Sequence, residues 1–171
     1  MVAKTRDTFI RKWWTRGHQE SDPFDRFFYC WIAAVVAANR YPMWGDSDTD
    51  RERFLSYLRE HEPEVLDVLR TQSDLMTKLA RRRGTRHGNP IVDTGSAELR
   101  AMFGRLSMHY TGRGGMSDSD LVEAVGELLN KIRHTLFHGG KLYDDREDID
   151  LLGLVNPILD QIVRDSERFD G

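Results

Sequence analysis

Cysteine is almost absent from this chain, since Cys30 is the only one among 171 residues. A single cysteine excludes an intramolecular disulfide, and disulfide frameworks are typical of small domains that fold in oxidising compartments. Cys30 lies within an apolar run, so we interpret it as a core residue. The lack of a disulfide scaffold favours a reduced, cytoplasmic setting.

Long apolar runs and a strong excess of one charge are also missing. The longest uninterrupted apolar run, residues 27–38, is too short to span a bilayer, and no basic leader precedes it. We therefore expect neither a signal peptide nor a membrane anchor. The formal net charge of -3 excludes a strongly basic nucleic-acid-binding protein. A small cleft, however, needs only a local positive field to bind RNA.

Strand-like alternation, internal repeats and low-complexity segments are absent as well. Apolar residues recur at helical spacing, most clearly after Asp22 and Pro23, which supply a cap and a first-turn proline. Helices are expected around 9–14, 23–40, 51–59, 64–69, 75–82, 99–106, 117–138 and 151–163. The sequence therefore predicts an all-α helical bundle that forms one domain over residues 1–171.

Proline and glycine mark the interruptions of this pattern. The segment 84–95 contains three glycines and a proline, which predicts an exposed loop. Pro157 lies inside the last predicted helix. It should either kink that helix or begin a new turn with Asn156 as the cap.

Residues 132–141 are the most informative part of the sequence, because a cation and an imidazole flank the point where a helix must stop. Gly139 and Gly140 end that helix. His138 would then lie beside free carbonyls, which carry the negative end of the helix dipole and favour imidazolium. An imidazole that titrates near neutrality can both give and take a proton.

The spacing of Arg133 and His138 limits how the two side chains can meet. At about 100° per residue, His138 points roughly 140° away from Arg133 on a regular helix. They can converge if the last turn unwinds into the glycines, or if each faces its counterpart in a second chain across a symmetry axis. Arg82 and His87 repeat the spacing, but in a glycine-broken loop without an apolar stripe.

The run Ile-Arg-His-Thr-Leu-Phe-His-Gly-Gly-Lys, on the penultimate long helix of a helical chain, resembles the signature of the HEPN superfamily. The motif of that family is Arg-x4-6-His. A further amphipathic helix follows, as the family's last core helix would. Residues 24–33 also resemble the opening helix of some bacterial members.

The resemblance implies a HEPN-like helical bundle with additional short helices. It also implies metal-independent cleavage of RNA by a homodimer in which the two motifs meet in a shared cleft. Arg133 and His138 would be the catalytic residues. Arg133 would hold the phosphate and stabilise its transition state. His138 would serve as general base or acid at the ribose 2′-hydroxyl or the leaving 5′-oxygen. Such enzymes include toxins and defence effectors, for which an antitoxin protein is a further partner.

His134 departs from the family pattern, which commonly has a small polar residue after the arginine. Whether His134 assists the reaction, replaces another group or plays no part stays open. Many relatives have lost activity. The alternative function is therefore a non-catalytic module that binds nucleotide or RNA, or that pairs with a nucleotidyltransferase-type partner.

A basic stretch offers a second candidate RNA contact. Arg81, Arg82, Arg83 and Arg86 could follow a phosphate backbone, although such charge runs are as often a solvated surface. Lys141, just beyond the glycines, is a candidate second phosphate contact.

A metal site has weaker support. His134 and His138 are four positions apart, which suits zinc, but no cysteine or carboxylate follows at a matching local spacing. We expect neither a metal nor a cofactor. A metal-dependent hydrolase is the third alternative, and its activity would be lost in a chelator.

Overall fold

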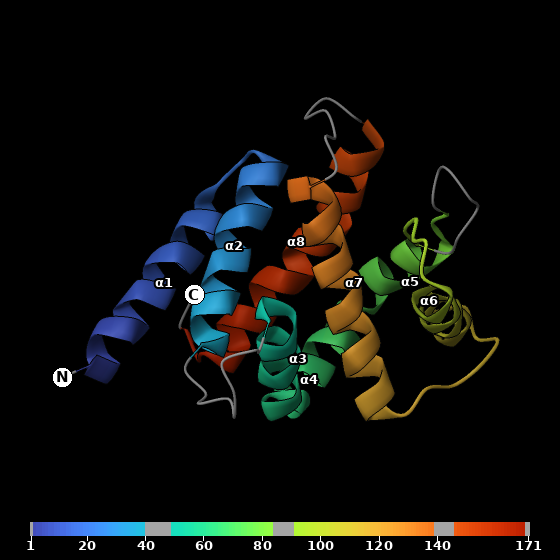
Figure 1. Ribbon diagram of the computed structural model, residues 1–171, viewed down its shortest axis with the longest axis horizontal. Coiled ribbons are helices and arrows are strands. Elements are labelled where there is room, and N and C mark those ends of the chain that lie inside the picture. The colour runs from blue at the N-terminus through green and yellow to red at the C-terminus, as the bar shows by residue number, and fades with distance from the viewer. Residues whose placement is uncertain (1, 40–48, 84–90, 139–145, 170–171) are drawn as a thin grey trace.

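The computed structural model describes residues 2–39, 49–83, 91–138 and 146–169. Within these ranges the chain forms eight α-helices and no β-strand, which confirms the all-α class. The helices are α1 (Val2–Gln19), α2 (Pro23–Ala38), α3 (Asp50–Glu60), α4 (Glu62–Thr71), α5 (Ser73–Arg81), α6 (Ala97–Tyr110), α7 (Asp118–His138) and α8 (Arg146–Ser166) (Figure 1). None of these described helices is both long and apolar enough to cross a membrane.

Local capping chemistry explains where several helices begin. The Asp22 side chain accepts hydrogen bonds from two free N–H groups at the start of α2, and Pro23 occupies its first turn, as predicted. Thr49 and Glu52 cap α3 reciprocally in a capping box. At the start of α7, the Ser117 hydroxyl accepts from the backbone N–H three residues on.

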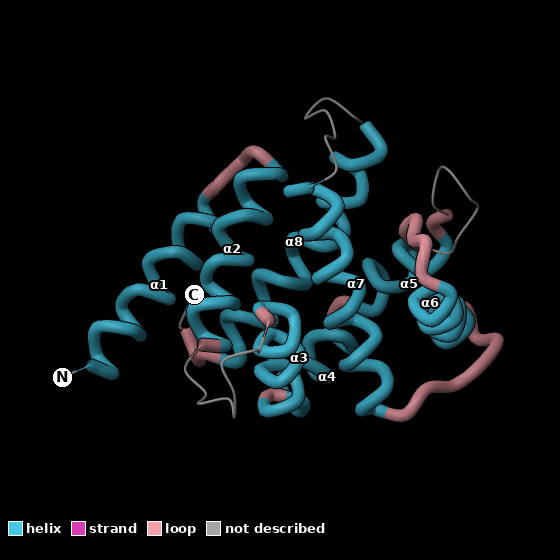
Figure 2. Tube along the Cα trace, viewed as in Figure 1, coloured by secondary structure: helices cyan, strands magenta, loops and turns pink. Residues whose placement is uncertain are grey.

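Two groups of helices meet around one hydrophobic core. Helices α1 and α2 form a hairpin that packs on α8, which also contacts α4 and α5 (Figures 1 and 2). Helix α7 packs against α3, α4 and α6. Every one of the eight helices contributes buried side chains to the core. Helix α7 is therefore held from several sides, with its C-terminal end beside α2.

The last helix differs from one sequence expectation. Helix α8 runs without interruption through Pro157, so of the two expected outcomes, a kink or a new turn with Asn156 as its cap, the new turn is wrong. The Asn156 side-chain amide instead donates a hydrogen bond to the Pro23 carbonyl at 2.9 Å. Val155 and Ile158, on either side, are buried in the core. Tertiary packing thus offsets the loss of one backbone hydrogen bond at the proline.

The predicted loop 84–95 is described only from residue 91 onward. From there to Ser96 the chain is not helical, as predicted, but the expected exposure is wrong for Ile91, Val92 and Thr94, which are buried. Ile91 is fully buried in this segment and has a φ of 68°. The loop is thus fastened to the core by a residue in a strained backbone conformation.

Candidate functional site

The C-terminal end of α7 carries the predicted motif. The helix extends through His138, so its last turn does not unwind before the histidine. Residues 133 and 138 therefore lie roughly 140° apart around the axis. An unwound last turn, one of the two arrangements considered from the sequence, is not present up to His138. The His138 side chain and the whole of Lys141 lie outside the described residues.

Arg133 is half-buried and is held by aromatic rings. Its guanidinium carbon lies 5.9 Å from the centroid of the Trp31 ring and 6.0 Å from that of Phe137. No carboxylate of the described residues pairs with Arg133, which argues against a surface ion pair as its role. Cation–π contacts fix a guanidinium while leaving its N–H groups free to bind phosphate.

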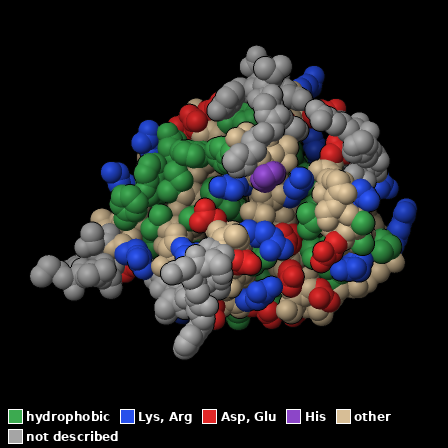
Figure 3. Space-filling view, viewed as in Figure 1, with side chains coloured by type: hydrophobic (Ala, Val, Ile, Leu, Met, Phe, Trp, Pro, Cys, Tyr) green, Lys and Arg blue, Asp and Glu red, His purple; other side chains and the backbone are tan. Residues whose placement is uncertain are grey.

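Exposed aromatic side chains extend from the part of α7 beside Arg133 onto α2 and α1. Phe137 is 43% exposed, Phe28 38% and Phe9 46%. The rings of Phe28 and Phe137 lie 5.4 Å apart. Figure 3 shows an apolar patch over α1 and α2 on the face that also presents a histidine with basic neighbours over α7. Contiguous exposed apolar surface of this kind is typical of a contact site.

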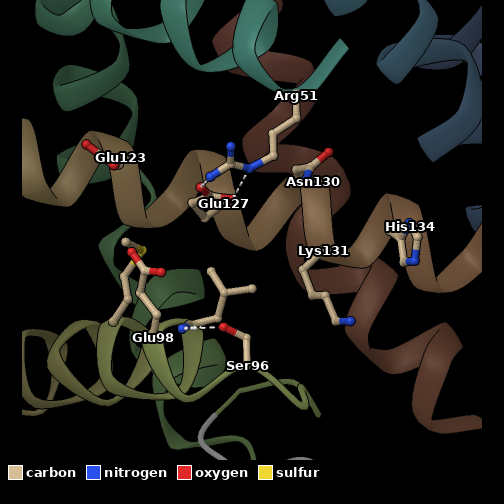
Figure 4. A pocket seen from close by; sticks show the side chains of 10 residues that line it. Arg51, Ser96, Glu98, Glu123, Glu127, Asn130, Lys131 and His134 are labelled. Carbon is tan, nitrogen blue, oxygen red and sulfur yellow. Dashed lines mark hydrogen bonds and ion pairs between the residues drawn. The ribbon is translucent and has the colours of Figure 1, made fainter. Parts of the chain in front are cut away.

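A cavity of about 310 Å³ lies on the other flank of α7. It is enclosed by α7, by the start of α3 and by the first turns of α6 (Figure 4). Its α7 side chains are Glu123, Glu127, Asn130, Lys131 and His134. Helix α6 and its cap supply Ser96, Glu98, Leu99 and Met102.

An ion pair between the exposed Arg51 and the buried Glu127 joins α3 to α7 at this cavity. Glu127 is only 3% exposed. Arg51 Nε donates to Glu127 Oε2 at 3.0 Å, and Arg51 Nη2 contacts Oε1. This hydrogen bonding raises the pKa of Arg51 above its ordinary value. A bidentate contact of this kind satisfies the buried carboxylate and fixes the guanidinium plane.

His134 lies on the cavity side of α7, separate from Arg133. The His134 side chain is exposed and lines the cavity, whereas Arg133 contacts the rings on the α2 side. Adjacent positions on a helix differ by about 100° in direction, which accounts for the separation. The structure thus places the two described motif side chains on different flanks of one helix.

The basic stretch has mixed surroundings. Arg82 is half-buried, and its guanidinium donates to the backbone carbonyls of Ile91 at 3.4 Å and Glu147 at 2.5 Å. These contacts tie the end of α5 to the loop and to α8. Arg81 and Arg83 are exposed, and Arg86 lies outside the described residues.

Sequence reasoning did not single out Arg51, Glu127 or Lys131. The available signal was the carboxylate of Glu127 among apolar neighbours, because a buried carboxylate needs a cation. Its partner is 76 positions away, however, and no local spacing could identify it.

Comparison with known proteins gives no relative: no protein-family model, no curated protein and no solved structure matches this chain. In the part of the chain that the structure describes, no group of three or more His, Cys, Asp or Glu side chains is placed to hold a metal ion. The function therefore has to be argued from the site itself.

Proposed function

We propose that this chain is a metal-independent endoribonuclease of the HEPN type that acts as a homodimer, of the kind used as toxins or defence effectors. The observation that carries the proposal is the setting of Arg133. Its guanidinium is held by two rings at the end of α7, without a carboxylate partner among the described residues, and His138 follows five positions later. A guanidinium held in this way is suited to a phosphodiester.

The chemistry proceeds by attack of the ribose 2′-hydroxyl. The His138 imidazole accepts the hydroxyl proton as O2′ forms a bond to the adjacent phosphorus. The bond from phosphorus to the 5′-oxygen breaks, and that oxygen receives a proton from an imidazolium. Arg133 binds the non-bridging oxygens and neutralises the charge of the transition state. The products are a 2′,3′-cyclic phosphate and a 5′-hydroxyl.

The homodimer is supported by the geometry of α7. Because Arg133 and residue 138 lie on different sides of a regular helix, one chain alone does not bring them to one phosphate. A two-fold axis near the end of α7 would place each motif opposite its copy. The exposed rings of Phe28 and Phe137, beside Arg133, would then be covered.

Cleavage of a mixed RNA pool by the purified protein in EDTA tests the proposal. Arg133→Ala and His138→Ala should each lower the cleavage rate by about a hundredfold or more. Arg70→Ala, which removes an exposed arginine of α4, is the matched control and should cleave like the wild type. End-group analysis should find cyclic phosphate and 5′-hydroxyl ends.

Two outcomes would contradict the proposal and favour the alternatives. A folded protein that binds RNA or a protein partner without cleaving RNA would be a non-catalytic module. Cleavage that is lost in EDTA and restored by a divalent ion would indicate a metal-dependent hydrolase.

A further inference from the structure

The cavity beside α7 has two basic side chains at one end and two carboxylates at the other. Lys131 and His134 lie toward one end, and Glu98 and Glu123 toward the other (Figure 4). The ion pair between α3 and α7 lies between them. This layout matches an elongated ligand that is anionic at one end and carries hydrogen-bond donors at the other.

Three polar side chains that line the cavity have no partner in the part of the chain that the structure describes. They are the ammonium of Lys131, the amide of Asn130 and the carboxylate of Glu98. Lys131 and Asn130 are half-buried, so they have lost part of their hydration without gaining a protein partner. A bound ligand would restore these hydrogen bonds.

The remaining walls suit an aromatic base. Leu99 and Met102 supply apolar surface from α6. Arg51 is fixed by Glu127, and a guanidinium held in a plane can stack on a nucleobase. The volume of about 310 Å³ lies at the lower end of the range for small-ligand sites. An amide such as that of Asn130 can bind the edge of a base in a bidentate manner.

We infer that this cavity binds one nucleotide. Its phosphate contacts Lys131, at the end of the cavity away from Glu98 and Glu123. Its ribose hydroxyls and base amino groups donate to Glu98. The inference deepens the proposed function, on which the choice of a ribonucleotide rests. A nucleotide bound here would guide the RNA strand along the flank of α7 that also carries residue 138.

Isothermal titration of the full chain with the four nucleoside 3′-monophosphates, and with inorganic phosphate, tests this inference. At least one nucleotide should bind about tenfold more tightly than inorganic phosphate, because base and ribose add contacts. Lys131→Gln and Asn130→Ala should each weaken its binding by about tenfold. Lys78→Gln, an exposed lysine of α5, is the control and should leave binding unchanged.

Further variants separate this inference from the proposed function. Arg133→Ala should abolish cleavage and leave nucleotide binding intact, because Arg133 lies on the other flank of α7. Glu98→Gln should also weaken nucleotide binding. Because Glu98 lies on the exposed surface of α6, this substitution cannot disturb the core. The nucleotide site would be overturned if nucleotides and inorganic phosphate bound with equal affinity. It would also be overturned if the cavity variants folded correctly and bound nucleotide as the wild type does. Nucleotide binding without RNA cleavage would overturn only the proposed ribonuclease activity.

Discussion

Cys30 shows how strongly burial changes the chemistry of one residue in this protein. The side chain is fully buried where α2 contacts α1. Burial raises the pKa of the thiol from 9.0 to about 12, and the nearby carboxylate of Asp160 adds to the effect. At pH 8 the folded protein thus holds about a thousandfold less thiolate than an exposed cysteine would. We expect Ellman's reagent to react with Cys30 only when the protein is unfolded in urea.

The same shift sets a dependence of stability on pH. The folded state holds the thiol proton more tightly than the unfolded state does, so the protonated thiol contributes to stability. This contribution is complete below the unfolded pKa and is lost as pH rises toward about 12. Between pH 8 and 11, the free energy of unfolding of Cys30→Ala should therefore fall less than that of the wild type. Tyr110, whose pKa burial also raises to about 12, remains in both proteins. Rapid labelling of native Cys30 at pH 8 would contradict this account.

The residues of the motif could be singled out from the sequence as candidates, whereas those of the cavity could not. The run at 132–141 is contiguous and stands where glycines end a helix. The cavity combines α3, α6 and α7, which are far apart in the chain. Spacing does not reveal which flanks of these helices face one another. Lys131 and Asn130 therefore had no feature that distinguished them from other surface residues.

Helices were more predictable, because their boundaries depend on nearby residues. Asp22 and Pro23 begin α2, and the apolar spacing along α7 and α8 predicts which of their side chains are buried in the core. Pro157 could not be interpreted from local rules alone. Those rules allowed either a kink or a new turn, whereas contacts of α8 with α1, α2, α4 and α5 keep the helix continuous. The HEPN-like arrangement of these helices remains a proposal.

The packing of α1 on α2 depends on one glycine. A Cβ atom at Gly17 would lie 2.7 Å from Cys30 Sγ and 3.0 Å from the Cys30 backbone nitrogen. Gly17→Ala should therefore push the two helices apart and lower the free energy of unfolding by about 1–3 kcal/mol. Urea unfolding followed by circular dichroism measures this change.

Gly153 in α8 provides the matched control, because a Cβ atom there meets no atom within 4 Å. Gly153→Ala should leave packing unchanged and raise the free energy of unfolding by up to about 1 kcal/mol through helix propensity. If both variants gained stability, the close approach of α1 to α2 would be refuted.

At the scale of the whole molecule, α7 separates two surfaces. One flank presents Arg133 with the aromatic side chains that extend onto α2. The other flank presents His134 and the cavity. An RNA strand in the cavity of one chain would approach residue 138 of that chain, while Arg133 points away from it. In the proposed homodimer, a second chain would supply the arginine for the same phosphate.

This arrangement predicts complementation between inactive chains. A dimer of one Arg133→Ala chain and one His138→Ala chain keeps one arginine and one histidine, on different chains. If each working pair forms across the two-fold axis, such mixed dimers should cleave RNA although both parent homodimers do not. Co-expression with two different affinity tags and sequential purification isolates the mixed species, and light scattering verifies its mass. Mixed dimers as inactive as their parents would show that the pair forms within one chain, and a monomeric wild type that cleaves RNA would exclude the shared cleft altogether.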